Sequence, residues 1–360
     1  MPSNIAERYV TMLRVERTRD NCKEESVIEQ QPSAETPASH TRKIPIHERS
    51  VRVGDVIVVN GYRANLTLLK KRFAEGNYQV HETGHFLLFT REAEPKTILT
   101  HWFKPEEINS NIVHYLVQEL KPYNVISQSE QLGELLTGII GGTVFAGDVQ
   151  RAWNYFGANT LQRLLVYVGN ALPSDLPDYM ALGLFATLYQ RVCELCRGEH
   201  FLDAGCNSGL LPLLFAERIP FMREAVGVDI DANAFRIGQA VAAERRLTNV
   251  RYVQADLLAA NFSSIGLFDT VTALHVLEHI PESDLHRVLR NLLNVTAQRL
   301  IIAVPYETGK PEVAYGHLQL FSRAKLESLG AWCIDQLQGA GRIWCEDLCG
   351  GLLLIERHSS

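Results

Sequence analysis

The feature that most constrains this chain is the run His200 to Ala216, which reads HFLDAGCNSGLLPLLFA. A strand pattern ends at Asp203, a glycine turn runs from Gly205 to Gly209, and an apolar helix pattern starts at once. Such a unit directs the free N–H groups of the first helical turn, and the positive end of the helix dipole, at a ligand. The glycines lack a Cβ, so they admit positive φ and close approach of that ligand. The run therefore predicts a nucleotide-type site.

Two ligands compete for such a site. A dinucleotide fold expects G-x-G-x-x-G and an acidic residue about 20 residues further on, a place that suits Asp229. The turn reads G-C-N-S-G, however, with Asn207 in place of the second glycine. Asp203, just before the turn, would repel a pyrophosphate and attract an ammonium group. A nucleoside with an ammonium group at its other end is S-adenosylmethionine, which the residues therefore favour.

The run resembles motif I of the class I (Rossmann-like) S-adenosylmethionine-dependent methyltransferases, usually D-x-G-C-G-x-G, with Asn207 at the central glycine. From His200 onward strand and helix patterns alternate, which is typical of a doubly wound parallel sheet. The resemblance covers residues 200–357 and implies an α/β fold with a doubly wound, seven-stranded, mostly parallel sheet whose last strand is antiparallel. The patterns predict strands ending at Asp203 and over 224–230, 250–256, 268–274, 299–304, 332–337 and 351–357, and helices over 232–246, 282–296 and 322–329.

The chain upstream of this methyltransferase-like domain, expected over residues 198–360, divides into three segments by composition. Residues 1–45 form a polar, poorly ordered tail with a short helix pattern over Ile5–Arg17 and a disordered stretch over Asp20–Thr41. Residues 46–104 read as a small α+β module: a strand over 50–59, a turn at 60–61, a helix over 64–75 and two short strands around 83–84.

Helical patterns dominate residues 105–197, over 106–119, 130–140, 149–170 and 179–197. We interpret this region as a lid or linker that completes an acceptor pocket. Its aromatic side chains either line that pocket or belong to the core, and they are Trp153, Tyr155, Phe156, Tyr167 and Tyr179.

Three acidic residues stand at the carboxyl ends of three successive predicted strands, where a ligand of an open α/β sheet lies. By resemblance, Asp203 anchors the methionine end of the cofactor, Asp229 accepts from the ribose hydroxyls, and Asp256 accepts from the adenine amine. One such residue alone would pass for a helix N-cap, whereas three together favour the cofactor. The expected cofactor-binding residues are Asp203, Gly205, Asn207, Gly209, Asp229, Ile230, Asp256, Leu257 and His275.

The fourth strand runs into the sequence LHVLEHI (274–280), which contains the H-x-x-E-H pattern of some metalloproteases. That pattern requires a helix with both histidines on one face, but here it begins at a strand end. The stretch L-x-x-L-E-H-I is also common at this point in the methyltransferase family. The loop is expected to face the transferred methyl group, although Glu278 and His279 could equally tie the loop to its helix.

A second segment, Tyr315 to Ser322, resembles the H-x-x-x-F-S stretch of the same family and brings His317 to the acceptor side. An imidazole suits the removal of a proton from a hydroxyl acceptor. The catalytic candidates are His275, His279 and His317, and the expected acceptor-binding residues are Tyr179, Glu278, Tyr306 and His317.

No metal site is expected in this sequence. His81 and His85 flank a predicted hairpin turn, where paired histidines are more often surface polar residues than ligands. Cys193 and Cys196 form a C-x-x-C on a helix, with Cys345 and Cys349 far downstream, and zinc would need a knuckle-like setting.

Composition limits the partners. A formal net charge of −6 gives no basic footprint for nucleic acid. The longest apolar run, 135–147, has 13 residues, whereas a membrane span needs about 20. Seven cysteines without framework spacing and no apolar leader at the N-terminus suit a cytoplasmic protein. A homodimer through the N-terminal half is left open.

The predicted function is transfer of a methyl group from S-adenosylmethionine to a small-molecule acceptor, such as a secondary metabolite, with S-adenosylhomocysteine as product. O-methylation is favoured because the motifs of nucleobase enzymes, N/D-P-P-Y and a Pro-Cys pair, do not occur. N- or C-methylation, or a non-catalytic methyltransferase-like scaffold, are the alternatives.

Overall fold

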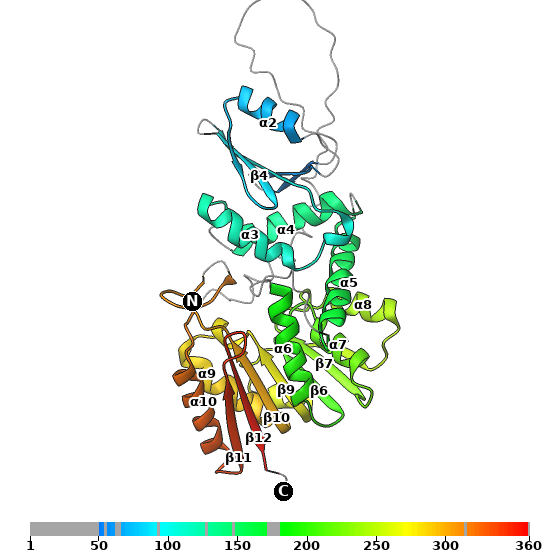
Figure 1. The fold of residues 1–360 in the computed structure, drawn as a ribbon. Coiled ribbons are helices and arrows are strands. Elements are labelled where there is room, and N and C mark those ends of the chain that lie inside the picture. The colour runs from blue at the N-terminus through cyan, green and yellow to red at the C-terminus, as the bar shows by residue number, and fades with distance from the viewer. Residues whose placement is uncertain are drawn as a thin grey trace, which may run out of the picture.

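The computed structural model describes residues 50–53, 56–61, 66–91, 94–126, 129–145, 148–170, 181–312 and 315–358. Two sheets lie at opposite ends of the molecule, and helices fill the space between them (Figure 1). The helix expected over Ile5–Arg17 and the disordered stretch expected over Asp20–Thr41 lie outside the described residues.

The N-terminal sheet has five strands in the order β1-β2-β5-β4-β3, and only β2 and β5 are parallel. The single strand expected over residues 50–59 is wrong, because two antiparallel strands, Ser50–Val53 and Val56–Asn60, occupy this segment. The fifth strand was not predicted, since its first half carries a proline and a lysine. The strands are β1 (Ser50–Val53), β2 (Val56–Asn60), β3 (Gln79–Glu82), β4 (Phe86–Arg91) and β5 (Glu94–His101).

Both faces of this sheet are covered. Helix α2 (Leu66–Glu75) packs on one face, where the rings of Phe73 and Phe89 lie 4.2 Å apart. The other face contributes Phe86 and Leu88 to a large apolar cluster that also contains side chains of the following helices. These helices are α3 (Asn111–Leu120), α4 (Ser129–Thr143), α5 (Val149–Tyr167) and α6 (Ala181–Leu195).

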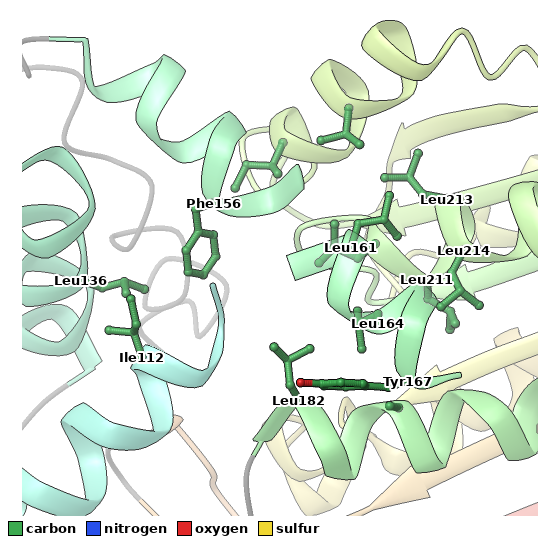
Figure 2. Close-up of a cluster of buried hydrophobic side chains, with 14 of the residues drawn as sticks. Ile112, Leu136, Phe156, Leu161, Leu164, Tyr167, Leu182, Leu211, Leu213 and Leu214 are labelled. Carbon is green, nitrogen blue, oxygen red and sulfur yellow. The ribbon is translucent and has the colours of Figure 1, made fainter. Parts of the chain in front are cut away.

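The same apolar cluster continues from this helical region into the C-terminal half. Figure 2 shows Ile112 and Leu136 at one side, Phe156 and Leu164 of α5 in the middle, and Leu211 and Leu214 of α7 at the other. Helix α5 thus packs against both α7 (Leu210–Arg218) and α8 (Arg236–Arg245). Within the described ranges, each helix is too short or too polar to cross a bilayer.

The C-terminal sheet has seven strands, as expected, in the order β11-β12-β10-β9-β6-β7-β8. It is a mixed sheet, in which β12 runs antiparallel to both β10 and β11 while β10, β9, β6, β7 and β8 are parallel. The strands are β6 (His200–Ala204), β7 (Glu224–Asp229), β8 (Val250–Gln254), β9 (Phe268–Leu274), β10 (Thr296–Val304), β11 (Gly341–Glu346) and β12 (Gly351–Arg357).

Alternate residues of each central strand enter opposite apolar layers. In β6, Phe201 packs with α5, α6 and α7, whereas Leu202 packs with α9 (Leu285–Asn294) and α10 (Arg323–Gln336). Helices therefore cover both faces of the sheet (Figure 1), which is the doubly wound arrangement.

One expected strand is wrong. Residues 332–336 form the last part of α10, and Leu337 caps its end. The helix begins after Ser322, whose side chain accepts a hydrogen bond from the backbone N–H of Lys325 at 3.3 Å. Buried Leu326, Leu329 and Cys333 follow the helical period through this segment. The strand at this edge of the sheet is β11, which has little apolar alternation because Ile343 and Trp344 are both exposed.

The contact between α5 and α8 depends on Gly157. A Cβ at this position would overlap the Cγ2 of Ile237, whereas a Cβ at Gly141 in α4 meets nothing within 4 Å. We expect Gly157→Ala to lower the free energy of unfolding by about 1–3 kcal/mol through overpacking.

Gly141→Ala is the matched control and should raise that free energy by about 0.5–1 kcal/mol, because alanine loses less conformational entropy in a helix. Urea unfolding of both variants measures the two changes. An equal gain for both would contradict the close packing of α5 on α8.

Candidate functional site

The turn after β6 is fixed by its own backbone. The N–H groups of Gly205 and Cys206 both donate to the carbonyl oxygen of Val228, at 2.7 and 2.8 Å. Gly205 and Gly209 have φ of 78° and 74°, and Asn207 has φ of 46°. Asparagine enters this left-handed region more readily than most non-glycine residues, so Asn207 keeps the shape that glycine gives the usual motif.

Tyr252 of β8 supports the turn. Its hydroxyl donates to the carbonyl oxygen of Gly209 at 2.7 Å, and its ring stacks on Phe235 at 5.4 Å. A Cβ on Gly209, Gly227 or Gly238 would overlap this tyrosine, so three glycines from separate elements make room for one ring. Tyr252 was not predicted as part of the site, and only the glycine pattern around it could have indicated its place.

Asp203 ends β6 as a buried carboxyl group. Its Oδ1 accepts a hydrogen bond from Thr272 Oγ1 on β9 at 2.8 Å. Burial, with a smaller effect from the charge of Asp229, raises the pKa of Asp203 to about 7, while the Thr272 hydrogen bond opposes the shift. Burial, followed by the charge of Asp203, also raises the pKa of Tyr189 on α6. An ammonium group bound here would favour the ionised carboxylate.

Asp229 ends β7 beside the turn. Its Oδ2 accepts from the N–H of Asn207 at 2.9 Å, and its Oδ1 accepts from the N–H of Asp231 at 3.1 Å. Each carboxylate oxygen can accept a second hydrogen bond, so acceptor capacity remains for a diol. Burial raises the pKa of Asp229, although these two backbone hydrogen bonds oppose the shift. The neighbouring Ile230 is exposed.

Asp256 follows β8 and is exposed, with its Oδ1 accepting from the N–H of Leu258 at 2.8 Å. Leu257 is buried, and its carbonyl oxygen accepts from Asn291 Nδ2 of α9 at 2.7 Å. The loop after β8 is thus anchored to α9. The three acids stand at the ends of the adjacent strands β6, β7 and β8, as the sequence indicates.

The histidines come from the loops after β9 and β10. His275 has φ of 55°, and its N–H donates to the carbonyl oxygen of Ala303 at 2.8 Å. Its ring meets the Phe185 ring of α6 edge-on, with centroids 5.3 Å apart. His279 lies in the 3-10 helix η5 (Leu277–His279), and its ring is 5.0 Å from that of His317. The three predicted histidines therefore belong to one region of the structure.

Carboxylates surround these histidines. Glu278 is fully buried, and its Oε1 lies 3.2 Å from His275 Nδ1. Glu307 Oε1 accepts from His317 Nδ1 at 2.7 Å. Burial lowers the pKa of His279, although the charge of Glu278 opposes this, so a neutral imidazole is favoured. Glu307 and Phe185 were not predicted as site residues. Glu307 follows Tyr306 at the end of β10, a position that could have drawn attention to it.

Other predicted residues lie apart from this group or outside the described residues. Tyr306 packs against Gly351 of β12, and burial raises its pKa. Tyr179 lies outside the described residues. Trp153, Phe156 and Tyr167 are buried in the apolar cluster and Tyr155 packs on it, which supports the core interpretation.

The histidine pair 81/85 and the four cysteines are the other residues of metal-binding types singled out in the sequence. His85 Nδ1 pairs with Glu119 at 2.5 Å and its ring stacks on Tyr115, while His81 Nε2 is 3.4 Å from Thr90 Oγ1. The cysteines at 193, 196, 345 and 349 are free thiols.

The state of Asp203 gives a pH-dependent prediction. Its pKa is about 7 in the fold against an ordinary value of 3.8, so its contribution to stability is complete below about pH 4 and is lost as the pH rises through 7. Asp203→Asn should therefore stabilise the unliganded protein at pH 8, by at most about 4 kcal/mol, and much less at pH 4.

Melting temperatures of wild type and Asp203→Asn across this range measure the effect, with the exposed Asp256→Asn as a control for charge removal. A gain for Asp203→Asn that does not change with pH would contradict the raised pKa.

Comparisons with known proteins show what this domain resembles. Residues 201–299 match the family described as "Methyltransferase domain". The ubiquinone biosynthesis O-methyltransferase of Albidiferax ferrireducens is 32% identical over 130 residues, which cover 31% of this chain and 50% of that protein. The chain thus spans about half the length of this relative.

Two solved structures are also similar. The small RNA methyltransferase HEN1 has a TM-score of 0.43 at 15% identity and covers 53% of this chain and 27% of its own. Magnesium protoporphyrin IX methyltransferase from Synechocystis with bound SAH has a TM-score of 0.37 at 18% identity, covering 58% of this chain and all of its own. The family match and the curated relatives, together with the strand order and the glycine turn, show that the chain contains a class I S-adenosylmethionine-dependent methyltransferase domain.

Proposed function

We propose that this protein transfers the methyl group of S-adenosylmethionine to a hydroxyl oxygen of a small-molecule acceptor. The observation that carries the proposal is the order of polar groups along one edge of the sheet. Acids end β8, β7 and β6, and histidines follow β9 and β10. A cofactor at the acids therefore has the histidines on its acceptor side.

The cofactor side has a group for each part of S-adenosylmethionine. Asp203 takes the ammonium group of the methionine moiety, and this positive charge keeps its carboxylate ionised. Asp229 uses its remaining acceptor capacity for the ribose hydroxyls. Asp256 accepts from the adenine amine, while the side chain of Leu257 lies against the ring.

On the acceptor side, the chemistry is a displacement at an activated sulfonium carbon. The enzyme must hold the two reactants in line and remove the proton of a hydroxyl acceptor. His275, His279 and His317 supply imidazoles for that proton, and Phe185 packs against one of them. Tyr179, Glu278 and Tyr306 stay proposed contacts of the acceptor.

A small-molecule acceptor is supported by two observations. The curated relatives with the O-methyltransferase name are described as acting in ubiquinone biosynthesis, which concerns a small molecule. The net charge of −6 does not favour a polyanionic nucleic acid. A cytoplasmic location and a homodimer through the N-terminal half remain proposals.

The first test concerns the cofactor. Asp229→Ala removes the carboxylate proposed to bind the ribose diol and leaves the N–H of Asn207 without its acceptor. Each unpaired group costs about 1–3 kcal/mol, so affinity for S-adenosylhomocysteine should fall by at least about tenfold. Titration calorimetry of the folded variant measures this.

Asp335→Ala, on the exposed surface of α10, is the control and should bind normally. Normal affinity in Asp229→Ala would contradict the placement of the ribose. A wild-type protein that binds neither S-adenosylmethionine nor S-adenosylhomocysteine would support the scaffold alternative.

The second test concerns the acceptor side. Replacing His275, His279 or His317 by Ala should lower turnover for at least one of them by about 10²–10⁴, which is the usual contribution of a positioned acid or base. Cofactor affinity should change little in His279→Ala and His317→Ala, because the adenosine contacts lie at other strand ends.

His286→Ala is a suitable control, since this exposed histidine of α9 stacks on Trp332 away from the sheet edge. The turnover assay uses a panel of phenols, amines and carbon nucleophiles as methyl acceptors. The acceptor that is methylated distinguishes O-methylation from N- or C-methylation. If all three variants keep normal turnover with the accepted substrate, the histidines are not the proton acceptors.

A further inference from the structure

Glu278 is a buried carboxylate whose surroundings do not satisfy it. Its side chain has no exposed surface, and neither of its oxygens accepts a hydrogen bond from any described residue. His275 Nδ1 is near Oε1 but does not make a hydrogen bond with it. A buried carboxylate is costly unless it is paired, hydrogen-bonded or coordinated to a cation. The burial of Glu278 thus calls for a positive charge.

Two histidines, His279 and His317, lie close enough to Glu278 to hold a cation beside its carboxylate. Glu278, His279 and His317 each offer a ligand atom, and these atoms all lie within 4.8 Å of one another. In the described part of the chain, this is the one group of three or more histidine, cysteine or carboxylate side chains with that spacing. The N–H of Leu318 donates to the carbonyl oxygen of Glu278 at 2.8 Å, which holds the two loops together.

The hydrogen bonds at Nδ1 set the form of both imidazoles. His279 Nδ1 is 3.2 Å from the carbonyl oxygen of Gly316, and His317 Nδ1 is 2.7 Å from Glu307 Oε1. Carbonyl and carboxylate oxygens only accept, so each Nδ1 carries the hydrogen and each Nε2 carries the lone pair. Histidines that bind metals usually donate their other ring N–H to such an oxygen.

We propose that Glu278, His279 and His317 together bind a divalent transition-metal ion. The sequence alone led us to expect no metal, but two imidazoles and one carboxylate form a donor set that suits zinc and iron. Magnesium and calcium prefer all-oxygen sites and fit less well. His279 is half-buried, whereas the side chain of His317 is only 8% exposed.

The consequence for the reaction rests on the proposed function. Three protein ligands leave coordination positions open, and an acceptor hydroxyl bound there would lose its proton more readily. With His279 and His317 holding the ion, neither could act as the base, and His275 or water would take that proton. The hydroxyl oxygen then forms a bond to the methyl carbon as the carbon–sulfur bond breaks, and the electron pair of that bond returns to sulfur.

The experiment measures metal binding without an acceptor. The full chain is stripped with a chelator, dialysed against Zn²⁺ or Co²⁺, and analysed by mass spectrometry for about one ion per chain. Glu278→Gln, His279→Ala and His317→Ala should each weaken binding by more than about 100-fold. Glu307→Gln should weaken it by about 10–100-fold, as expected when an outer hydrogen-bond partner is lost.

Two controls accompany these variants. His286→Ala should bind metal like the wild type, and Glu278→Gln keeps the shape of the side chain, so its fold should survive. Zn²⁺ should raise the melting temperature of wild type and of His286→Ala, but not of the three ligand variants. Affinity for S-adenosylhomocysteine, measured in parallel, reports on the fold of each variant.

A wild-type chain that binds neither ion stoichiometrically overturns the proposal, as does undiminished binding in Glu278→Gln, His279→Ala and His317→Ala. If S-adenosylhomocysteine binds while metal does not, the metal site fails and the proposed function stands. If metal binds while S-adenosylhomocysteine does not, the proposed function fails and the site stands.

Discussion

The carbonyl oxygen of Val228 accepts hydrogen bonds from two successive residues of the turn, Gly205 and Cys206. This pair of bonds attaches the turn after β6 to the end of β7, so the carboxylate of Asp229 can accept from Asn207 directly. Tyr252 then supports the turn from β8. The position of each acid along the sheet edge therefore depends on backbone bonds between neighbouring strands.

The ends of the parallel strands could be predicted because each combines a short apolar run with an acid. Asp203 and Asp229 each terminate such a run, and the structure places them on adjacent strands. The left-handed conformation of Asn207 was not anticipated, but it explains why the departure from the family motif does not disturb the turn. The cofactor-binding roles of these residues stay predictions that the proposed experiments address.

The remaining features of the fold and of the site depend on contacts between distant segments, which no local sequence pattern encodes. β11 is an edge strand with exposed Ile343 and Trp344, so it lacks the alternation that makes a strand visible. Phe185 reaches His275 from a helix that precedes the domain, and Glu307 reaches His317 across a loop. The H-x-x-E-H pattern indicates metal binding only on a helix. The metal site that we propose instead combines Glu278 and His279 with His317 from a distant segment.

One apolar cluster contains both Val58 of β2 and Leu354 of β12, with α5 between them. The side of α5 that packs on α7 and α8 is synthesised before either of those helices exists. During translation, the N-terminal half therefore emerges with an apolar face whose partners are still to come, and such a surface is prone to aggregation until they arrive. The order of the elements along the chain thus makes the packing of α5 depend on synthesis continuing to the end of α8 at Arg245.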